Sequence, residues 1–216
     1  MTILVFSDTH LTHRFNKKKF LFLSRIIKKA DKVIINGDFW DGHISSFHRF
    51  INSKWSMLFK LLKQKKTVYI YGNHDRKEYC DSRVSSFSTI QTTHYKINFN
   101  KQKYYFEHGN AFFPSTDNKL YNISYLLIKV ITHIISLIEL PIQHLKIWFG
   151  GVILNKKIKK KRNGETKNGF IVCGHTHYPE IDQKNRFLNT GFIKYGIASY
   201  LLIDNRGFQL RKESYL

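Results

Sequence analysis

Five short polar motifs in this sequence carry side chains that could bind metal ions. They are S-D-T-H at 7–10, N-G-D-F-W-D at 36–41, G-N-H-D at 72–75, E-H-G-N at 107–110 and G-H-T-H at 174–177. Together they offer carboxylates, imidazoles and amides. If the motifs converge, so many polar groups in one place would be costly unless a cation lies among them. Mixed oxygen and imidazole ligands suit manganese, iron or zinc.

The segments before the first three motifs are apolar and rich in strand-forming residues. Strands are expected at 2–7, 32–36 and 67–71, and apolar residues at helical spacing separate them at 20–30 and 47–62. The alternation predicts an α/β fold built from βαβ units, with functional groups gathered beyond the carboxyl ends of parallel strands. Further short strands are expected at 94–99, 103–109, 169–175, 186–191 and 199–204.

The spacing within two motifs predicts a shared orientation of their side chains. Asp8 and His10 are two residues apart, as are His175 and His177, and side chains two apart point the same way in an extended strand. Glycine, asparagine and aspartate also favour turns, so an ordinary turn is the alternative explanation for G-N-H-D. All five motifs in this order, each near the end of an apolar run, favour the metal site.

The motifs resemble those of the calcineurin-like metallophosphoesterases, which are D-x-H, G-D-x-x-D, G-N-H-D/E, His-Gly and G-H-x-H. Here they span residues 8–177, most of the 216-residue chain. The resemblance implies a four-layer αββα sandwich (an α/β, or α+β, fold) with a dinuclear metal site. The chain length fits one domain over 1–216, with a helical cap insertion at about 112–166.

The resemblance also implies a role for each motif residue. One metal would be held by Asp8, His10 and His177, the other by Asn73, His108 and His175, with Asp38 bridging the two. A hydroxide shared by the metals would attack phosphorus. His74 would face the scissile phosphate and stabilise charge or protonate the leaving oxygen; Asp75 would orient it, and Asp41 would support the site without binding metal. Asn189 matches a segment common after G-H-x-H, although a turn asparagine explains it equally well.

The charge balance predicts an anionic partner. Lysine and arginine number 36 against 15 aspartates and glutamates, a formal charge of +21, which attracts nucleic acid, an acidic membrane surface or a phosphorylated small molecule. Most of this charge is lysine, including the run 156–162, and lysine favours general attraction over sequence reading. Lysine-rich solvated helix faces are the alternative explanation for the lysine clusters other than 156–162. The 42% hydrophobic content excludes a disordered chain.

The segment between His108 and His175 is too long for an ordinary loop. Residues 121–140 predict a helix with a wide apolar face, whose charged residues argue against a membrane span, and a second apolar stretch at 142–155 runs into the basic cluster. An apolar face followed by basic residues is typical of a helix at an acidic lipid surface. A helical pair packed on its own domain is the alternative.

This insertion resembles the cap of the UDP-2,3-diacylglucosamine diphosphatases of lipid A synthesis, which cleave a pyrophosphate bond while the cap holds acyl chains. Many of those enzymes carry arginine where this chain has His74, and aspartate where it has Asn110. The resemblance implies a lipid-linked nucleotide substrate and a cytoplasmic protein that is peripheral at the inner face of the membrane. Manganese is the metal we expect, with iron or zinc as alternatives.

Two other function classes remain open from the sequence. A phosphodiesterase or nuclease acting on nucleotides or nucleic acid would use the basic surface and show a steep salt dependence. A metal- or lipid-binding module without catalysis would not need His74 beside the ligands. Cys80 and Cys173 cannot form a disulfide framework, and the N-terminus lacks the pattern of a signal peptide, so we expect a reducing, cytoplasmic setting.

Overall fold

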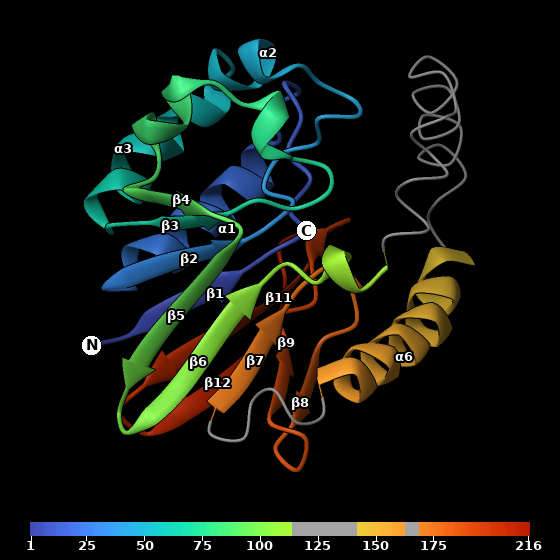
Figure 1. Ribbon diagram of the computed structural model, residues 1–216. Helices are drawn as coiled ribbons and strands as arrows, with labels where there is room; N and C mark the ends of the chain where they lie inside the picture. Colours follow the sequence, from blue (N-terminus) through green and yellow to red (C-terminus); the bar gives the residue numbers. More distant parts are fainter. Residues whose placement is uncertain (114–141, 163–168) are drawn as a thin grey trace.

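Two β-sheets packed face to face form the centre of the fold (Figure 1). The computed structural model describes residues 1–113, 142–162 and 169–216. Within them, one sheet has the order β10-β11-β1-β2-β3-β4, with β12 paired to β11, and the other has the order β5-β6-β7-β9-β8. The first consists of β1 (Ile3–Phe6), β2 (Lys32–Asn36), β3 (Val68–Ile70), β4 (Ile90–Thr92), β10 (Ile193–Lys194), β11 (Ile197–Asp204) and β12 (Gly207–Ser214). The second consists of β5 (His94–Phe99), β6 (Gln102–Glu107), β7 (Gly169–Cys173), β8 (Glu180–Asp182) and β9 (Phe187–Asn189).

Parallel pairing brings the motifs to the ends of neighbouring strands. β1 pairs in parallel with β2, and β2 with β3, so the motifs at 7–10, 36–41 and 72–75 follow adjacent strand ends. In the second sheet β6, β7 and β9 are also parallel, and they end at the motifs beginning with Glu107 and Gly174 and at Asn189. The parallel βαβ arrangement predicted for the first half of the chain is confirmed.

The alternation of side chains along the strands builds an apolar layer on each side of the first sheet. Ile3 and Val5 face the second sheet, where they join Tyr104 and Val172. Leu4 and its outward-facing neighbours pack under the helices instead. Those helices are α1 (Lys17–Lys28), α2 (Phe47–Ile51) and α3 (Phe59–Gln64), with the 3₁₀ helix η1 (Lys54–Leu58) between the last two.

A helix on the far face of the second sheet completes four layers. α6 (Ile142–Arg162) lies beside β7 and β8 (Figure 1). Its Ile158 is buried against Ile171, Cys173 and Phe187 of the second sheet. The predicted αββα sandwich is confirmed, and the basic run 156–162 forms the last turns of α6 rather than a segment after it.

The prediction of one amphipathic helix over 47–62 is wrong. Asn52 ends α2, and the side chain of Ser53 accepts a hydrogen bond from the backbone N–H of Trp55, which starts η1. The break turns the Trp55 side chain into the core, where it is 1% exposed and where Nε1 donates to the Arg14 carbonyl at 3.2 Å. Tertiary packing of one large side chain therefore overrides the helical periodicity.

Four strands were not predicted from the sequence. β4, β8 and β10 have three residues or fewer, too short for a clear pattern. β12 is mostly polar, yet it pairs with β11 along its whole length from Gly207 to Ser214. Hydrogen bonds to β11 make this segment a strand, and the types of its own residues do not predict that pairing.

The predicted helix at 121–140 lies outside the described residues. For α6 the structure describes the whole backbone, but side chains only for residues 150–161. None of the helices in the described ranges is both long enough and apolar enough to cross a membrane.

Candidate metal centre

The backbone at the candidate ligands is left-handed rather than extended. β1 ends at Phe6, and Asp8, His10, Asp38, His175 and His177 all have φ between 44° and 62°. Non-glycine residues adopt this region at a cost of about 1–3 kcal/mol each, and such residues cluster at functional sites. The expectation that each Asp-x-His or His-x-His pair shares one face of an extended strand is therefore wrong. Loop geometry brings these side chains together.

Two glycines allow the loops to approach one another closely. Gly37 has φ +89°, and a Cβ there would overlap the imidazole of His108. A Cβ on Gly72 would overlap Oδ1 of Asp38. The glycine before Asp38 and the one before Asn73 are therefore required by contacts between different motifs.

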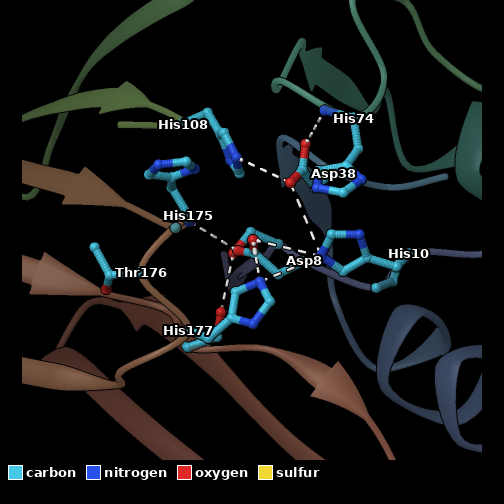
Figure 2. A network of polar contacts seen from close by, with 12 residues as sticks. Asp8, His10, Asp38, His74, His108, His175, Thr176 and His177 are labelled. Carbon is cyan, nitrogen blue, oxygen red and sulfur yellow. Dashed lines mark hydrogen bonds and ion pairs between the residues drawn. The ribbon is translucent and has the colours of Figure 1, made fainter. Parts of the chain in front are cut away.

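Asp8, His10 and His177 form the first group of candidate ligands (Figure 2). Nε2 of His177 lies 3.1 Å from Oδ1 of Asp8, and Nε2 of His10 lies 3.2 Å from Nε2 of His177. The other oxygen of Asp8 accepts a hydrogen bond from the backbone N–H of His175 at 3.0 Å. The motif after β1 and the motif after β7 are thus joined at this carboxylate.

Asn73, His108 and His175 form the second group. Oδ1 of Asn73 lies 3.1 Å from Nε2 of His108 and 2.9 Å from Nδ1 of His175. Nδ1 of His108 donates to the backbone carbonyl of Asn36 at 2.9 Å. That bond orients the ring so that Nε2 points into the centre, as the outer hydrogen bond does in metal-binding histidines.

Asp38 lies between the two groups. Its Oδ2 is 3.2 Å from Nε2 of His108 and 3.8 Å from Nε2 of His10, and Figure 2 shows it in the middle of the cluster. Its Oδ1 accepts a hydrogen bond from the backbone N–H of His74 at 2.9 Å. One carboxylate oxygen therefore faces candidate ligands of both groups.

The protonation states of His10, His175 and Asp38 suit metal binding. Burial and the nearby charge of His74 lower the pKa of His10 to about 4, and burial and the charge of His108 lower the pKa of His175 to about 3. Burial opposes ionisation of Asp38, but the charges of His108 and His74 outweigh it and hold the pKa well below its usual range. Neutral imidazoles beside ionised carboxylates are the forms that bind metal ions. His108 differs, because the charges of Asp38 and Asp8 outweigh burial and raise its pKa to about 10, so it would release a proton on binding a metal ion.

An unsatisfied carboxylate oxygen also fits a cation. Asp8 is fully buried, and its Oδ1 makes no hydrogen bond within the described part of the chain although His177 is close. A buried acceptor without a partner is costly. Groups of carboxylates and imidazoles with ligand atoms within 4.8 Å of one another include Asp8, His10 and His177, and also Asp8, Asp38 and His108. These residues fit divalent metal ions.

His74 lies beside the two groups, and its partner is Asp41. Nδ1 of His74 is 3.1 Å from Oδ1 of Asp41, and its ring meets that of His10 edge-on at 4.5 Å between centroids. Burial opposes protonation of His74, but the charges of Asp41 and Asp38 and the Asp41 hydrogen bond raise its pKa to about 9. A histidine that holds a proton next to a cationic site is suited to an anionic ligand.

The expectation that Asp75 orients His74 is not met. The Asp75 carboxylate accepts hydrogen bonds from the backbone N–H groups of Asp38 at 3.0 Å, Phe39 at 2.6 Å and Gly72 at 2.6 Å. These bonds turn its side chain under the loops and away from the imidazole. Asp75 holds two motifs together, whereas Asp41 contacts the histidine.

Comparison with protein families agrees with this geometry. The sequence profile described as "Calcineurin-like phosphoesterase superfamily domain" matches residues 1–204. The chain belongs to this superfamily. Divalent metals serve this family, and the chain is a metal-dependent phosphoesterase. No curated protein sequence matches the chain significantly.

Solved structures support the calcineurin-like fold. An archaeal phosphodiesterase superposes with a TM-score of 0.53 at 16% identity, covering 99% of each chain. Wild-type Vps29 of Entamoeba histolytica, in complex with zinc, superposes with a TM-score of 0.50 at 13% identity, covering 100% of each chain.

The phosphoesterase site includes residues that the sequence analysis missed. The ring of His43 lies 4.4 Å from that of His74, and burial and the His74 charge lower its pKa to about 4. Asn155 of α6 and Thr176 form a hydrogen bond under the G-H-T-H loop. The role of Asn155 could not be predicted from its neighbours in sequence, because an asparagine inside a predicted helix does not indicate which loop its side chain contacts. His43 comes two residues after Asp41, the last residue of the G-D-x-x-D motif, and that position was the available signal.

Asn189 is more than a turn residue in this phosphoesterase. It is 1% exposed, and its Nδ2 donates to the carbonyl of Gly174 at 2.9 Å. Its Oδ1 accepts from the backbone N–H of Gly191 at 2.9 Å. The asparagine therefore joins the end of β9 to the start of the G-H-T-H loop.

Proposed function

We propose that this phosphoesterase hydrolyses phosphodiesters with two divalent metal ions held on either side of Asp38. The observation that carries the proposal is the position of Asp38 Oδ2, within 3.8 Å of a histidine nitrogen from each group. A carboxylate oxygen so placed suits a bridge between two cations. The proposed ligands are Asp8, His10 and His177 for one ion and Asn73, His108 and His175 for the other.

The proposed metals are manganese ions, with iron or zinc as alternatives suited to the same ligands. The zinc complex of the Entamoeba Vps29, which has the same fold, is compatible with this ligand chemistry. Two bound cations would activate a water molecule as the nucleophile and neutralise the phosphate oxygens. The protein supplies the fixed ligand geometry and the charge around it.

His74 is the proposed catalytic side chain that does not bind metal. Its bond to Asp41 occupies Nδ1, which leaves Nε2 free to donate to a phosphate oxygen or to the leaving oxygen. In the metal-free protein the charges of Asp41 and Asp38 outweigh burial and raise the pKa of His74 to about 9. Asp41 holds the ring in place through Nδ1 and stabilises its positive charge.

A cavity next to the second group offers room for a substituent of the substrate. It has a volume of about 400 Å³ and is lined by residues that include Gly72, His108, Arg76 and Lys77. Its lining residues Gly72 and His108 place the cavity next to the proposed metal centre. The lining also includes the acidic Glu78 and Glu107, so basic and acidic side chains together suit a polar second substituent of the diester.

A lipid-linked nucleotide pyrophosphate is the second candidate substrate. The observation that favours it is the outer face of α6, where Ile153, Lys156, Lys157, Lys160 and Lys161 are exposed. Such a face suits contact with acidic lipid headgroups, which would bring the protein to the inner surface of a membrane. The acyl-binding part of this hypothesis concerns residues 114–141, which lie outside the described residues.

Hydrolysis assays with the purified protein and Mn²⁺ test the proposal. The substrates are bis-p-nitrophenyl phosphate, p-nitrophenyl phosphate, single-stranded DNA and UDP-2,3-diacylglucosamine, and Asp38→Asn is the control. We expect metal-dependent cleavage of the diester, lost in the control. Faster cleavage of the lipid nucleotide than of the diester would favour the second candidate. Metal binding without cleavage of any substrate would contradict a catalytic role.

A further inference from the structure

The buried face of α6 carries an asparagine that reaches the loop of the last metal motif. Asn155 is 0% exposed, whereas Lys156 and Lys157 beside it are exposed. A buried amide is costly unless its donors and acceptor are paired. Within the described residues, the hydrogen-bond partners of its side chain come from the chain between Thr176 and Asn189.

Hydrogen bonds from Asn155 hold both the side chain and the backbone of that segment. Its Nδ2 donates to the carbonyl of Tyr178 at 3.1 Å and to Oε2 of Glu180 at 2.8 Å. Its Oδ1 accepts from the hydroxyl of Thr176 at 2.7 Å and from Nδ2 of Asn189 at 3.2 Å. Both ends of the amide are therefore used.

Thr176 lies between the two proposed metal-binding histidines of the G-H-T-H motif. His175 and His177 have φ of 62° and 58°, a backbone form that persists only when surrounding contacts hold it. The Thr176 hydroxyl bonds to Asn155 on the side away from the metal centre, and Asn189 holds the carbonyl of Gly174. The loop is thus held from below by one residue of β9 and one residue of α6.

Other contacts also fix the position of α6 relative to the segment 176–182. Gly151 lies so close to it that an added Cβ would come 2.9 Å from the Thr176 carbonyl. Nζ of Lys159 lies 2.6 Å from Oε1 of Glu180 and 2.7 Å from Oδ2 of Asp182. Helix and loop are therefore docked on both sides of Asn155.

We propose that Asn155 is a positioning residue for the metal centre: through Thr176, α6 sets the positions of His175 and His177. This inference rests on the proposed function, because it assigns those histidines to the two metals. α6 is then part of the metal-binding structure as well as a cover for the second sheet.

Metal affinity measured on matched variants tests the proposal. Asn155→Ala removes the amide, and Thr176→Val removes only the hydroxyl while keeping the side-chain shape. Ile158→Ala is the control, because it weakens the packing of the same helix face against Phe187 without removing a hydrogen bond to the loop. Mn²⁺ dissociation constants come from titration calorimetry, and the Co²⁺-loaded absorption spectrum reports ligand geometry.

We expect Asn155→Ala and Thr176→Val each to weaken Mn²⁺ binding about 10-fold or more, the usual effect of losing a group that orients a ligand. The double variant should be hardly weaker than Asn155→Ala, since both single variants remove the hydrogen bond between Asn155 and Thr176. Thr176→Ser keeps the hydroxyl and should bind Mn²⁺ nearly as the unchanged protein does. Ile158→Ala should lower the melting temperature yet keep the affinity and the Co²⁺ spectrum.

Unchanged Mn²⁺ affinity in Thr176→Val would overturn the positioning role, even if Asn155→Ala failed to fold. Equal losses of affinity in Ile158→Ala and Asn155→Ala would overturn it as well, since general helix docking would then explain both. Failure of the metal centre itself gives a different result, because the unchanged protein would then bind no Mn²⁺.

Discussion

Nδ1 of His74 lies 3.1 Å from Oδ1 of Asp41, and the neighbouring Asp75 does not take part in this contact. Asp41 belongs to the motif after β2, whereas His74 belongs to the motif after β3. The pair joins two loops at the edge of the metal centre. The two carboxylates therefore have different roles: Asp41 contacts the imidazole of His74, whereas Asp75 accepts hydrogen bonds from backbone N–H groups.

Loss of the His74 side chain should reduce the rate without loss of metal. We expect His74→Ala to lower kcat by about 10²–10⁴, the usual contribution of a positioned proton donor, while the protein still binds Mn²⁺. Asp41→Asn should give a smaller loss, since the amide still contacts Nδ1 but carries no charge. Metal content by mass spectrometry and steady-state kinetics check both. A His74→Ala protein with normal kcat would remove His74 from the mechanism.

Replacement of Asp75 should affect folding more than chemistry. Asp75→Asn leaves one oxygen to serve the three backbone N–H groups that the carboxylate serves now. An orphaned buried donor costs about 1–3 kcal/mol, so we expect a lower free energy of unfolding in urea. The ratio of kcat to bound metal should stay near that of the unchanged protein. If Asp75→Asn lowered kcat more than Asp41→Asn does, Asp75 rather than Asp41 would be the residue that orients His74.

Asp38 and His177 should differ in how many metal ions their loss removes. Asp38 faces both groups, so Asp38→Ala should abolish loading at both sites and stop turnover. His177 contacts only the first group in this structure, and His177→Ala should retain one ion per chain. Metal content after dialysis against Mn²⁺ distinguishes them, and retention of both ions in Asp38→Ala would show that it is not the bridge.

Gly37→Ala should be more damaging than the same change at another glycine with positive φ. A Cβ at Gly37 overlaps the His108 ring, whereas Gly207 has φ +121° and nothing within 4 Å of an added Cβ. Both changes carry backbone strain of about 1–3 kcal/mol, but only Gly37→Ala should also weaken Mn²⁺ binding. Thermal melts with and without Mn²⁺ test this, and equal effects in both variants would leave strain as the whole explanation.

The stability of the metal-free protein should depend on His74 in a defined pH range. The folded state raises the pKa of His74 from 6.5 to about 9, so folding favours the protonated ring. This contribution is fully present below about pH 6.5 and is lost as pH rises towards 9. The melting-temperature difference between the unchanged protein and His74→Gln, measured in chelator, should therefore shrink from pH 6.5 to 9. A difference that grows over this range would contradict the assigned charge.

The sequence was sufficient to predict the parallel strands and the polar motifs that meet at the strand ends. Apolar runs that end in glycine and acidic or imidazole side chains identify β1, β2 and β3, because buried parallel strands read as continuous hydrophobic segments. The resemblance to the calcineurin-like family adds the grouping of Asp8 with His177 and of Asn73 with His175. Those contacts join residues far apart in the chain.

Contacts between distant segments decided the rest. Asp8, His10, Asp38, His175 and His177 lie in left-handed loops, a strain that only the assembled loops can support. The partner of His74 came from the loop after β2 rather than from the next residue in sequence. α6 supports the G-H-T-H loop through Asn155. Residue type and spacing determine which side chains are available for chemistry, but hydrogen bonds and packing between loops decide which of them meet.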